Sequence, residues 1–599
     1  MATATLQTSS GHLTQAEIKT LRGLNKIQSA KLEASFRKIL VRKNPFLLIE
    51  DDGLLKESEP CLKIKTKRAA IVPFVLNKAQ RHIYKIFKTL WDAGKPIRII
   101  VLKARQVGST TAFMAFIYSI ISQSESQAAA VIADEKGKAN DIFEMAKLFQ
   151  ERCPVYLRPE IKKSNERKLE FEGIHSQIAI DTAENKDAGR SATLRHVLLS
   201  EYAYYRKDNA DAIMLGISHS VPSLPHTMII KETTANGFNH FKDEWDAACA
   251  GKNNYTPIFV PWYWDEGYVM PFDEATFMIG DPAYGDETKD EPALAKQLES
   301  EGIDLIKERL AWRRWDIRNN CKGDVDKFSQ ENPSTPEMAF LASGSCFFDQ
   351  KKLVKQLNKL TPPLFRANIL KDNFKWVVRK CSDGDFWFYE EPSPYGQYVI
   401  GGDACSGSGT DYAPLVAMNK ETKSIAVVYR AKCDPDELAY RAMILGSFLN
   451  NAKVAIESDK FGFAANQKLI TIYGNVYVKR TYDKIQNKIT ESFGWQTTAL
   501  TRPMMLAQMQ LEIRNDTLQL KHEDLIRECL CFIKNPESGK AEAESGRNDD
   551  LVIACAIALQ LLTDDPYHLP AQGERESRRA REHDAMESHN AGMRFSGKK

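Results

Sequence analysis

A polar loop joins two apolar segments near residue 100, an arrangement that few folds accommodate. Residues 97–104 (IRIIVLKA) and residues 111–121 (TAFMAFIYSII) are nearly continuous apolar runs, and the polar stretch KARQVGSTT (103–111) links them. A short apolar strand that leads into an apolar helix is typical of a parallel sheet covered by helices on both faces. The sequence therefore predicts an α/β domain in which this loop connects a buried strand to a buried helix.

The same alternation continues to about residue 335. Further short apolar runs, separated by helical patterns, are AAAVIAD (128–134), QIAID (177–181), RHVLLSE (195–201) and TMIIKETT (227–234). We therefore expect one domain with a parallel sheet over residues 61–335. Residues 1–60 are polar and charged apart from a helical stretch, and we expect them to form an N-terminal appendage.

The residues after 335 predict a second domain with a different layout. Pro, Ser and Gly are frequent from residue 331 to 347, so we place a connector at residues 336–370. Beyond it, adjacent strands are expected at YVIGGDAC (398–405), YAPLVAMN (412–419) and SIAVVYRAK (424–432), and helices alternate with strands afterwards. This order predicts a mixed α/β sheet over residues 371–565. Residues 566–599 have almost no large apolar side chains, so we expect a flexible charged tail.

Composition narrows the class of protein without identifying it. A chain of 599 residues exceeds what one hydrophobic core usually supports, which agrees with two domains. The net charge is only +3, so binding to a phosphate backbone requires a local basic groove. The 11 cysteines include no CxxC pair, which indicates neither a zinc module nor a disulfide framework. The start is polar, and the apolar stretches are shorter than the ~20 residues that span a bilayer, so we expect a soluble cytoplasmic protein.

The loop at 103–111 has the residue types of a phosphate-binding loop in an altered order. In the pattern GxxxxGK[ST], backbone N–H groups surround the phosphates, Lys contacts the β and γ oxygens, and the hydroxyl binds Mg²⁺. Aligned on Gly108 and Thr110, this chain has Lys103 at the first Gly position and Ser109 at the Lys position, so Lys103 and Arg105 would supply the cation. The expected nucleotide contacts are Lys103, Arg105, Gln106, Gly108, Ser109, Thr110 and Thr111, with Arg105 also acting in catalysis. A basic strand end before an ordinary capped helix is the alternative.

Further candidates for the nucleotide site lie elsewhere in the same domain. Glu201 ends the apolar run RHVLLSE, where its carboxylate can orient or deprotonate an attacking water, although Ser200 occupies the place of the Asp that usually precedes it. Thr234 and Asn236 follow the next apolar run and would sense the γ-phosphate. The amide of Gln80 would pair with adenine. The alternatives are ordinary turn residues at strand ends and an exposed glutamine on a helix.

Four acids in the second domain stand at the edges of apolar runs. Asp403 ends YVIGGD, Glu457 ends KVAIE, and Asp549 and Asp550 open the apolar helix LVIACAIALQLL. Two-metal hydrolysis of phosphodiesters needs several carboxylates that converge from different strands around Mg²⁺ or Mn²⁺ ions ~4 Å apart. We therefore expect all four to bind metal and Asp403, Glu457 and Asp550 to act in catalysis. Taken singly, each acid is also explained as a turn former, a helix cap or a surface residue.

Over residues 70–562 these motifs resemble the large terminase subunit of tailed double-stranded DNA bacteriophages, the motor that packages genomes into procapsids. The resemblance rests on Gln80 and on KARQVGSTT, LLSE, ETTANGF, PSTPEMAFLASG, GGDACSGSGTDY, AIESDKFG, TLQLKHEDLIREC and GRNDDLVIACAIAL. It implies an N-terminal ATPase of the additional-strand (ASCE) P-loop class and a C-terminal ribonuclease H-like endonuclease. It also implies ATP and Mg²⁺, with Mn²⁺ as an alternative at the nuclease site.

The resemblance further implies partners and a setting. Such a motor would translocate double-stranded DNA, assemble as a homo-oligomeric ring on the portal protein, receive DNA from a small terminase subunit and cut concatemers in the host cytoplasm. Two other functions remain open from the residues alone. One is an ATP-dependent helicase or translocase with a catalytically silent ribonuclease H-like binding domain. The other is a transposase or integrase in which the P-loop likeness is chance.

Overall fold

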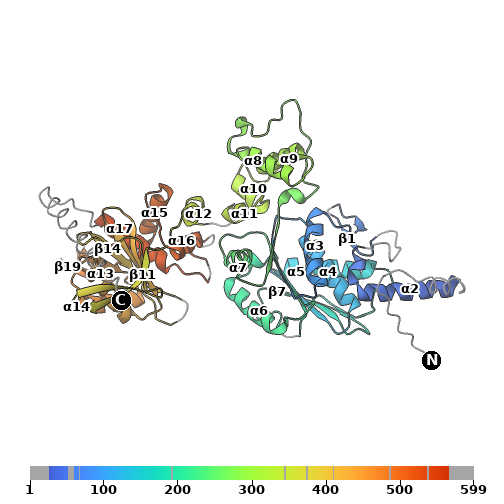
Figure 1. Ribbon diagram of the computed structural model, residues 1–599, viewed down its shortest axis with the longest axis horizontal. Coiled ribbons are helices and arrows are strands. Elements are labelled where there is room, and N and C mark those ends of the chain that lie inside the picture. Colours follow the sequence, from blue (N-terminus) through green and yellow to red (C-terminus); the bar gives the residue numbers. More distant parts are fainter. Residues whose placement is uncertain are drawn as a thin grey trace, which may run out of the picture. The chain divides into compact units, whose positions relative to one another are not determined.

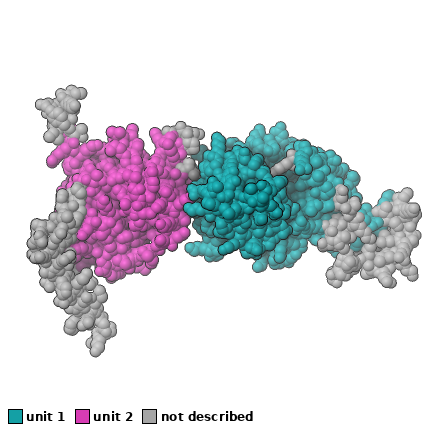
Figure 2. All heavy atoms as spheres, turned by 90° about the horizontal axis from the view of Figure 1, so that it is seen from above, with its two compact units in different colours: residues 1–344 teal, residues 345–599 magenta. Residues whose placement is uncertain are grey.

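The computed structural model describes residues 26–564 except 51–59, 67, 191–192, 343–345, 373–374, 409–410, 484–487, 536–538 and 545. The chain divides into two compact units, unit 1 (Met1–Gly344) and unit 2 (Ser345–Lys599), which Figure 2 colours teal and magenta. The division falls inside the stretch predicted as a connector. Within the described residues, no helix is both long and apolar enough to cross a membrane.

Unit 1 is built on an eight-stranded sheet with the order β10-β3-β9-β8-β4-β7-β6-β5. Its strands are β3 (Ile97–Lys103), β4 (Ala128–Ala133), β5 (Ile161–Ser164), β6 (Lys168–Phe171), β7 (Gln177–Thr182), β8 (His196–Ser200), β9 (Met228–Thr233) and β10 (Thr256–Val260). The strands from β10 to β7 are parallel, as predicted, and β6 and β5 add an antiparallel edge that was not predicted.

Helices cover both faces of this sheet (Figure 1). The helices of unit 1 are α2 (Lys26–Lys43), α3 (Lys78–Asp92), α4 (Ser109–Gln123), α5 (Lys136–Arg152), α6 (Lys207–Ser220), α7 (His240–Cys249), α8 (Glu291–Ser300), α9 (Ile306–Asn319), α10 (Val325–Glu331) and α11 (Pro336–Ala342). In β3, Ile99 and Val101 pack into the core beneath α3, α4 and α5, whereas Ile100 and Leu102 pack into the core beneath α6 and α7. This alternation explains why β3 is apolar at nearly every position.

Part of the segment predicted as an N-terminal appendage packs into the core of unit 1. The 3₁₀ helix η1 (Pro45–Leu48) is buried, and the Phe46 ring makes edge contacts with Phe87 and Trp91 of α3 at 5.5 and 5.1 Å. The apolar cluster PFLLI was overlooked because charged residues surround it in the sequence. The predicted appendage also contains the described helix α2, whereas its residues 1–25 and 51–59 lie outside the described part of the chain.

Unit 2 is built on a seven-stranded mixed sheet with the order β12-β11-β13-β16-β15-β14-β17. Its elements are α12 (Gln350–Asn358), β11 (Phe365–Asp372), β12 (Lys375–Lys380), β13 (Phe386–Phe388), β14 (Tyr398–Gly402), β15 (Ala413–Asn419), β16 (Ile425–Ala431), α13 (Pro435–Phe448), β17 (Lys453–Ile456), α14 (Lys460–Ile472), β18 (Val478–Asp483), β19 (Lys488–Phe493), α15 (Thr501–Arg514), α16 (Glu523–Leu530), β20 (Phe532–Lys534), β21 (Ala541–Ala543) and α17 (Asp550–Asp564). Within this sheet β14 and β17 are parallel, and the other neighbouring pairs are antiparallel. The predicted mixed sheet is confirmed.

The apolar helix α17 lies directly against the centre of this sheet. At Gly401 of β14, a Cβ atom would stand 2.1 Å from the Ala554 carbonyl oxygen of α17, so only glycine allows this approach. Nearly all side chains of α17 are buried, as its composition predicts. The close packing fixes the first turn of α17, which carries Asp550, beside the end of β14, which leads into Asp403.

Candidate active sites

The first candidate site lies at the carboxyl ends of three neighbouring parallel strands of unit 1. The order β3-β9-β8 places Lys103, the segment after Thr233 and Glu201 at one edge of the sheet. Ligand sites of open parallel sheets form at this edge. The structure therefore brings together residues that the sequence separates by up to 130 positions.

A buried ion pair forms the centre of this site. Lys103 Nζ donates to Glu201 Oε1 at 2.8 Å, and both side chains are largely shielded from water. Burial alone would lower the pKa of Lys103, but the Glu201 and Glu232 carboxylates outweigh it and raise the pKa above its ordinary value. Burial alone would raise the pKa of Glu201, but Lys103 and the Thr234 amide hold it below its ordinary value. Both groups are therefore charged at neutral pH.

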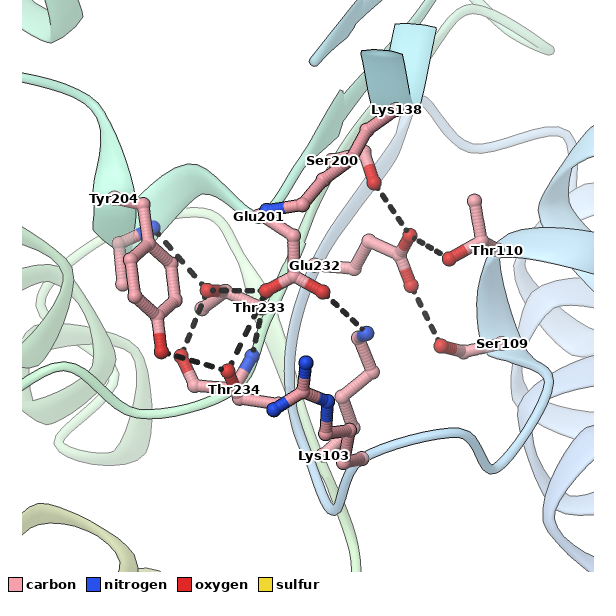
Figure 3. Close-up of polar contacts among 12 residues, drawn as sticks. Lys103, Ser109, Thr110, Lys138, Ser200, Glu201, Tyr204, Glu232, Thr233 and Thr234 are labelled. Carbon is pink, nitrogen blue, oxygen red and sulfur yellow. Dashed lines mark hydrogen bonds and ion pairs between the residues drawn. The ribbon is translucent and has the colours of Figure 1, made fainter. Parts of the chain in front are cut away.

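The segment after β9 holds the second oxygen of Glu201. Oε2 accepts hydrogen bonds from the Thr234 backbone N–H at 3.2 Å and from the Thr233 hydroxyl at 3.3 Å (Figure 3). Glu201 has a φ of 55°, a left-handed conformation that non-glycine residues seldom adopt. The Thr234 hydroxyl also meets the Tyr204 hydroxyl at 3.1 Å. Glu201 is thus fixed from two neighbouring strands.

Glu232 belongs to this site and was not predicted. Its side chain is fully buried on β9, where it accepts hydrogen bonds from Ser109 at 2.6 Å, Thr110 at 2.5 Å and Ser200 at 3.1 Å (Figure 3). The sequence offered a signal, because a charged residue inside the apolar run TMIIKETT needs a buried partner. The prediction instead named Thr234 and Asn236, which follow Glu232 in the chain.

The loop before α4 is held in place by α3. Gly108 has a φ of 82° and caps α4, and a Cβ atom there would stand 2.6 Å from Gln80 Nε2. Gln80 Nε2 donates to the Gly108 carbonyl oxygen at 2.9 Å, and Gln80 Oε1 accepts from the Asn77 N–H at 3.0 Å. Both ends of the Gln80 amide are engaged in these bonds. In the structure Gln80 braces the loop, and its predicted pairing with adenine remains untested.

The other predicted nucleotide contacts lie around the loop in different settings. Arg105 is 63% exposed and pairs with Glu331 at 2.8 Å. Gln106 is also exposed. The Thr111 hydroxyl faces the Met145 sulfur of α5 at 3.8 Å, and Asn236 Nδ2 donates to the Ala203 carbonyl oxygen at 3.2 Å. Arg105 and Gln106 are therefore accessible from solvent, whereas the polar ends of Thr111 and Asn236 bond within the protein.

The second candidate site lies in unit 2, where β14 and β17 run parallel side by side. Asp403 and Glu457 directly follow these strands, and the Glu457 N–H donates to the Gly402 carbonyl oxygen at 2.8 Å. The Asp403 carboxyl group is half-buried and lies near the carboxyl groups of Glu457, Asp550 and Asp459. Four acids therefore lie near one another. They come from the ends of β14 and β17 and from the starts of α14 and α17.

The acids of this site oppose one another's ionisation. Burial, together with the neighbouring Glu457 and Asp550 carboxylates, raises the pKa of Asp403 well above its ordinary value. Burial also raises the pKa of Asp550 to about 6, although the Tyr412 N–H donates to its Oδ2 at 2.8 Å. Carboxyl groups that raise one another's pKa in this way are stabilised by a proton or a cation between them.

The two acids at the start of α17 have different surroundings. Asp550 lies near Asp403, whereas Asp549 Oδ2 pairs with Arg502 at 2.9 Å. The described residues contain no set of three or more Asp, Glu, His or Cys side chains already arranged closely enough to hold an ion. The oxygen donors are nevertheless those that Mg²⁺ and Mn²⁺ prefer.

No protein-family model matches the chain. Among solved structures, the large terminase of bacteriophage HK97 matches with 13% identity and a TM-score of 0.41, covering 86% of this chain and 99% of that chain. The large terminase of a thermophilic bacteriophage matches with 11% identity and a TM-score of 0.29, covering 81% of this chain and 99% of that chain. The large terminase nuclease of the thermophilic phage G20c, solved with bound magnesium, matches with 15% identity and a TM-score of 0.25, covering 35% and 96%.

These solved structures belong to the group of proteins that the sequence motifs resemble, the phage large terminases. The predicted α/β fold class is confirmed by the two sheets themselves, a largely parallel one in unit 1 and a mixed one in unit 2.

Proposed function

We propose that this protein is an ATP-driven motor that moves double-stranded DNA into a phage procapsid and cuts it with a metal-dependent endonuclease. One observation carries the proposal: each unit has an acidic site of its own, and the two sites differ in kind. Glu201 in unit 1 is paired with a buried lysine, whereas Asp403 in unit 2 faces other acids. The first arrangement suits phosphate binding and water activation, and the second suits divalent cations.

In unit 1 the proposed substrate is ATP with Mg²⁺. The N–H groups at the start of α4 would face the phosphates, and Lys103 would exchange its contact with Glu201 for phosphate oxygens. Glu201 would then be released to orient the attacking water. Because Glu201 accepts a hydrogen bond from the Thr234 N–H, a movement of Glu201 would also shift the segment after β9. Hydrolysis would thereby be coupled to a movement of the chain between β9 and α7.

In unit 2 we propose that Asp403, Glu457 and Asp550 hold divalent cations. When bound, such ions lower the pKa of water and stabilise the charge on a reacting phosphate. Asp403, whose pKa is raised, would give up its proton to bind them. The hydrogen bond from the Tyr412 N–H would hold the Asp550 carboxylate in place.

The proposed partners follow from the sequence resemblance. They are double-stranded DNA, a small terminase subunit, the portal protein and further copies of this chain in a ring, with the host cytoplasm as the setting. By the same resemblance the charged tail would contact the portal protein and the N-terminal appendage would contact the small subunit. Residues 566–599 and most of residues 1–60 lie outside the described part of the chain.

Two assays on the purified full-length protein test the proposal. We expect ATP hydrolysis that requires Mg²⁺, and cleavage of a supercoiled plasmid in Mg²⁺ or Mn²⁺ that EDTA abolishes. ATP hydrolysis without metal-dependent cleavage would favour a translocase with a silent second domain. Cleavage without ATP hydrolysis would contradict the motor.

A further inference from the structure

The carboxylate of Glu232 lies where an acid is expected on the next strand. In phosphate-loop enzymes, Mg²⁺ is held by the loop hydroxyl and by an acid that ends a neighbouring strand, directly before the catalytic glutamate. That position is Ser200 in this chain, on β8. Ser200 and Glu232 are direct partners in the parallel pairing of β8 with β9. The acid therefore lies on the neighbouring strand β9, at the position that pairs with Ser200.

Glu232 contacts both position 200 and the start of α4. One of its oxygens accepts from both Thr110, the loop hydroxyl, and Ser200, and the other accepts from Ser109. The carboxylate therefore reaches the place that an acid at position 200 would occupy. It also lies beside the hydroxyl that would contact the ion.

The charges around Glu232 leave an excess of negative charge. Lys103 is paired with Glu201, and Lys138, which also lies near Glu201, is paired with Asp134 at 2.5 Å. These two lysines face three acids, Glu201, Asp134 and Glu232. The direct donors to Glu232 are neutral hydroxyls. A fully buried carboxylate with neutral partners is costly unless a cation joins it.

We infer that Glu232 is the acid that holds Mg²⁺ with the nucleotide in unit 1, together with Thr110, in place of the missing acid at position 200. The inference rests on the proposed ATP site and adds a residue to it. Glu232 exchanges its hydrogen bond from Thr110 for a position in or next to the coordination shell of the ion. Ser200, its partner across the strands, keeps the carboxylate aligned.

Nucleotide affinity with and without Mg²⁺ tests this assignment without measuring hydrolysis. For the full-length protein, binding of a fluorescent ATP analogue is measured in EDTA and in Mg²⁺. We expect Glu232→Gln to bind the analogue in EDTA as tightly as the wild type and to lose the gain from Mg²⁺ by about tenfold or more. Asp246→Asn, which changes the net charge equally at a surface ion pair of α7, should keep the full gain.

The double variant Ser200→Asp/Glu232→Gln restores the acid on the other strand. We expect it to recover most of the Mg²⁺ gain, and this variant also decides the matter if Glu232→Gln alone does not fold. A full Mg²⁺ gain in Glu232→Gln, or none in the double variant, would overturn the inference. A wild type that binds no nucleotide in either condition would instead contradict the proposed ATP site.

Discussion

The acids of unit 1 have cationic or hydroxyl partners, whereas the central acids of unit 2 have mainly one another. Glu201 is paired with Lys103, and the pKa of Glu201 is held low. Asp403 lies against Glu457 and Asp550, and the pKa of Asp403 is driven up. In the unit 1 site the lysine balances the negative charge of the acid, and a bound phosphate would compete for that lysine. A site of acids alone becomes balanced only when protons or metal ions enter it.

The largest effect is expected from a substitution that disables the unit 1 site and leaves the unit 2 site intact. Glu201→Gln removes the group that would orient the attacking water, so we expect ATP hydrolysis to fall by about 10³-fold. Plasmid cleavage by the same preparation should stay within a factor of about two, because the acids of unit 2 are untouched. Steady-state phosphate release and gel-based cleavage assays measure the two activities. Undiminished ATP hydrolysis would remove Glu201 from the proposed mechanism.

The reverse separation is expected from the unit 2 site. Asp403→Ala removes a central oxygen donor, and the loss of several kcal/mol of transition-state stabilisation corresponds to a cleavage rate lower by about 10²- to 10³-fold. ATP hydrolysis should be unchanged. Cleavage that persists in this variant would indicate that another site cuts the DNA. The same assays as above apply, in Mg²⁺ and in Mn²⁺.

Removing one charge should change the stability of the two units in opposite directions. Glu201→Gln leaves Lys103 buried without its acid, so we expect unit 1 to lose about 3 kcal/mol. Asp403→Asn relieves repulsion between acids, so unit 2 without divalent ions should gain on the order of 1 kcal/mol at neutral pH. Hydrogen exchange of the full-length protein resolves the two units separately. A loss of stability in both units would contradict the difference proposed between the paired acid of unit 1 and the mutually repelling acids of unit 2.

The two units should also respond to pH in opposite directions. The pKa of Asp550 is raised to about 6, so its contribution to stability is present below its ordinary pKa and is lost as the pH rises through about 6. The pKa of Glu201 is lowered, so its contribution is present above its ordinary pKa and is lost as the pH falls through the lowered value.

In the proposed mechanism a metal ion replaces the proton on Asp550, so stabilisation of unit 2 by Mn²⁺ should grow between about pH 5 and about pH 8. Hydrogen exchange with and without Mn²⁺ at the two pH values measures it. Asp550→Asn should flatten this dependence. An equal effect of Mn²⁺ at both pH values in the wild type would show that these acids do not exchange protons for the ion.

The smallest expected effect separates the two neighbouring acids of α17. Asp549 is paired with Arg502 and is partly exposed, so Asp549→Asn should reduce cleavage by less than about tenfold. Asp550→Asn should reduce it far more, because Asp550 faces Asp403. Side-by-side cleavage rates settle the order. Equal losses would mean that Asp549 leaves Arg502 to bind metal.

The sequence predicted the elements that carry strong apolar patterns and the acids that end them. β3, β8, β14 and α17 were expected close to their observed limits because burial on both faces makes them continuously apolar. β12 (KWVVRK) and the hairpin of β18 and β19 were missed or misplaced, because basic and polar residues interrupt their patterns.

The candidate sites show the same limit. Lys103, Glu201 and Asp403 were predicted as site residues because they lie at the ends of apolar runs, and the structure places them at or directly after strand ends. Glu232 was missed because it lies inside a strand and its partners come from β8 and the start of α4, which the sequence alone does not place beside it. The difference between Asp549 and Asp550 likewise depends on Arg502, 47 positions away.

Titration of Mn²⁺ into the full-length protein without nucleotide, followed by calorimetry, tests the contrast between the two sites most directly. We predict that the wild type and Glu201→Gln bind Mn²⁺ alike and that Asp403→Asn loses this binding. Unchanged Mn²⁺ binding in Asp403→Asn would contradict the account, because it would show that the acids of unit 2 are not the cation site.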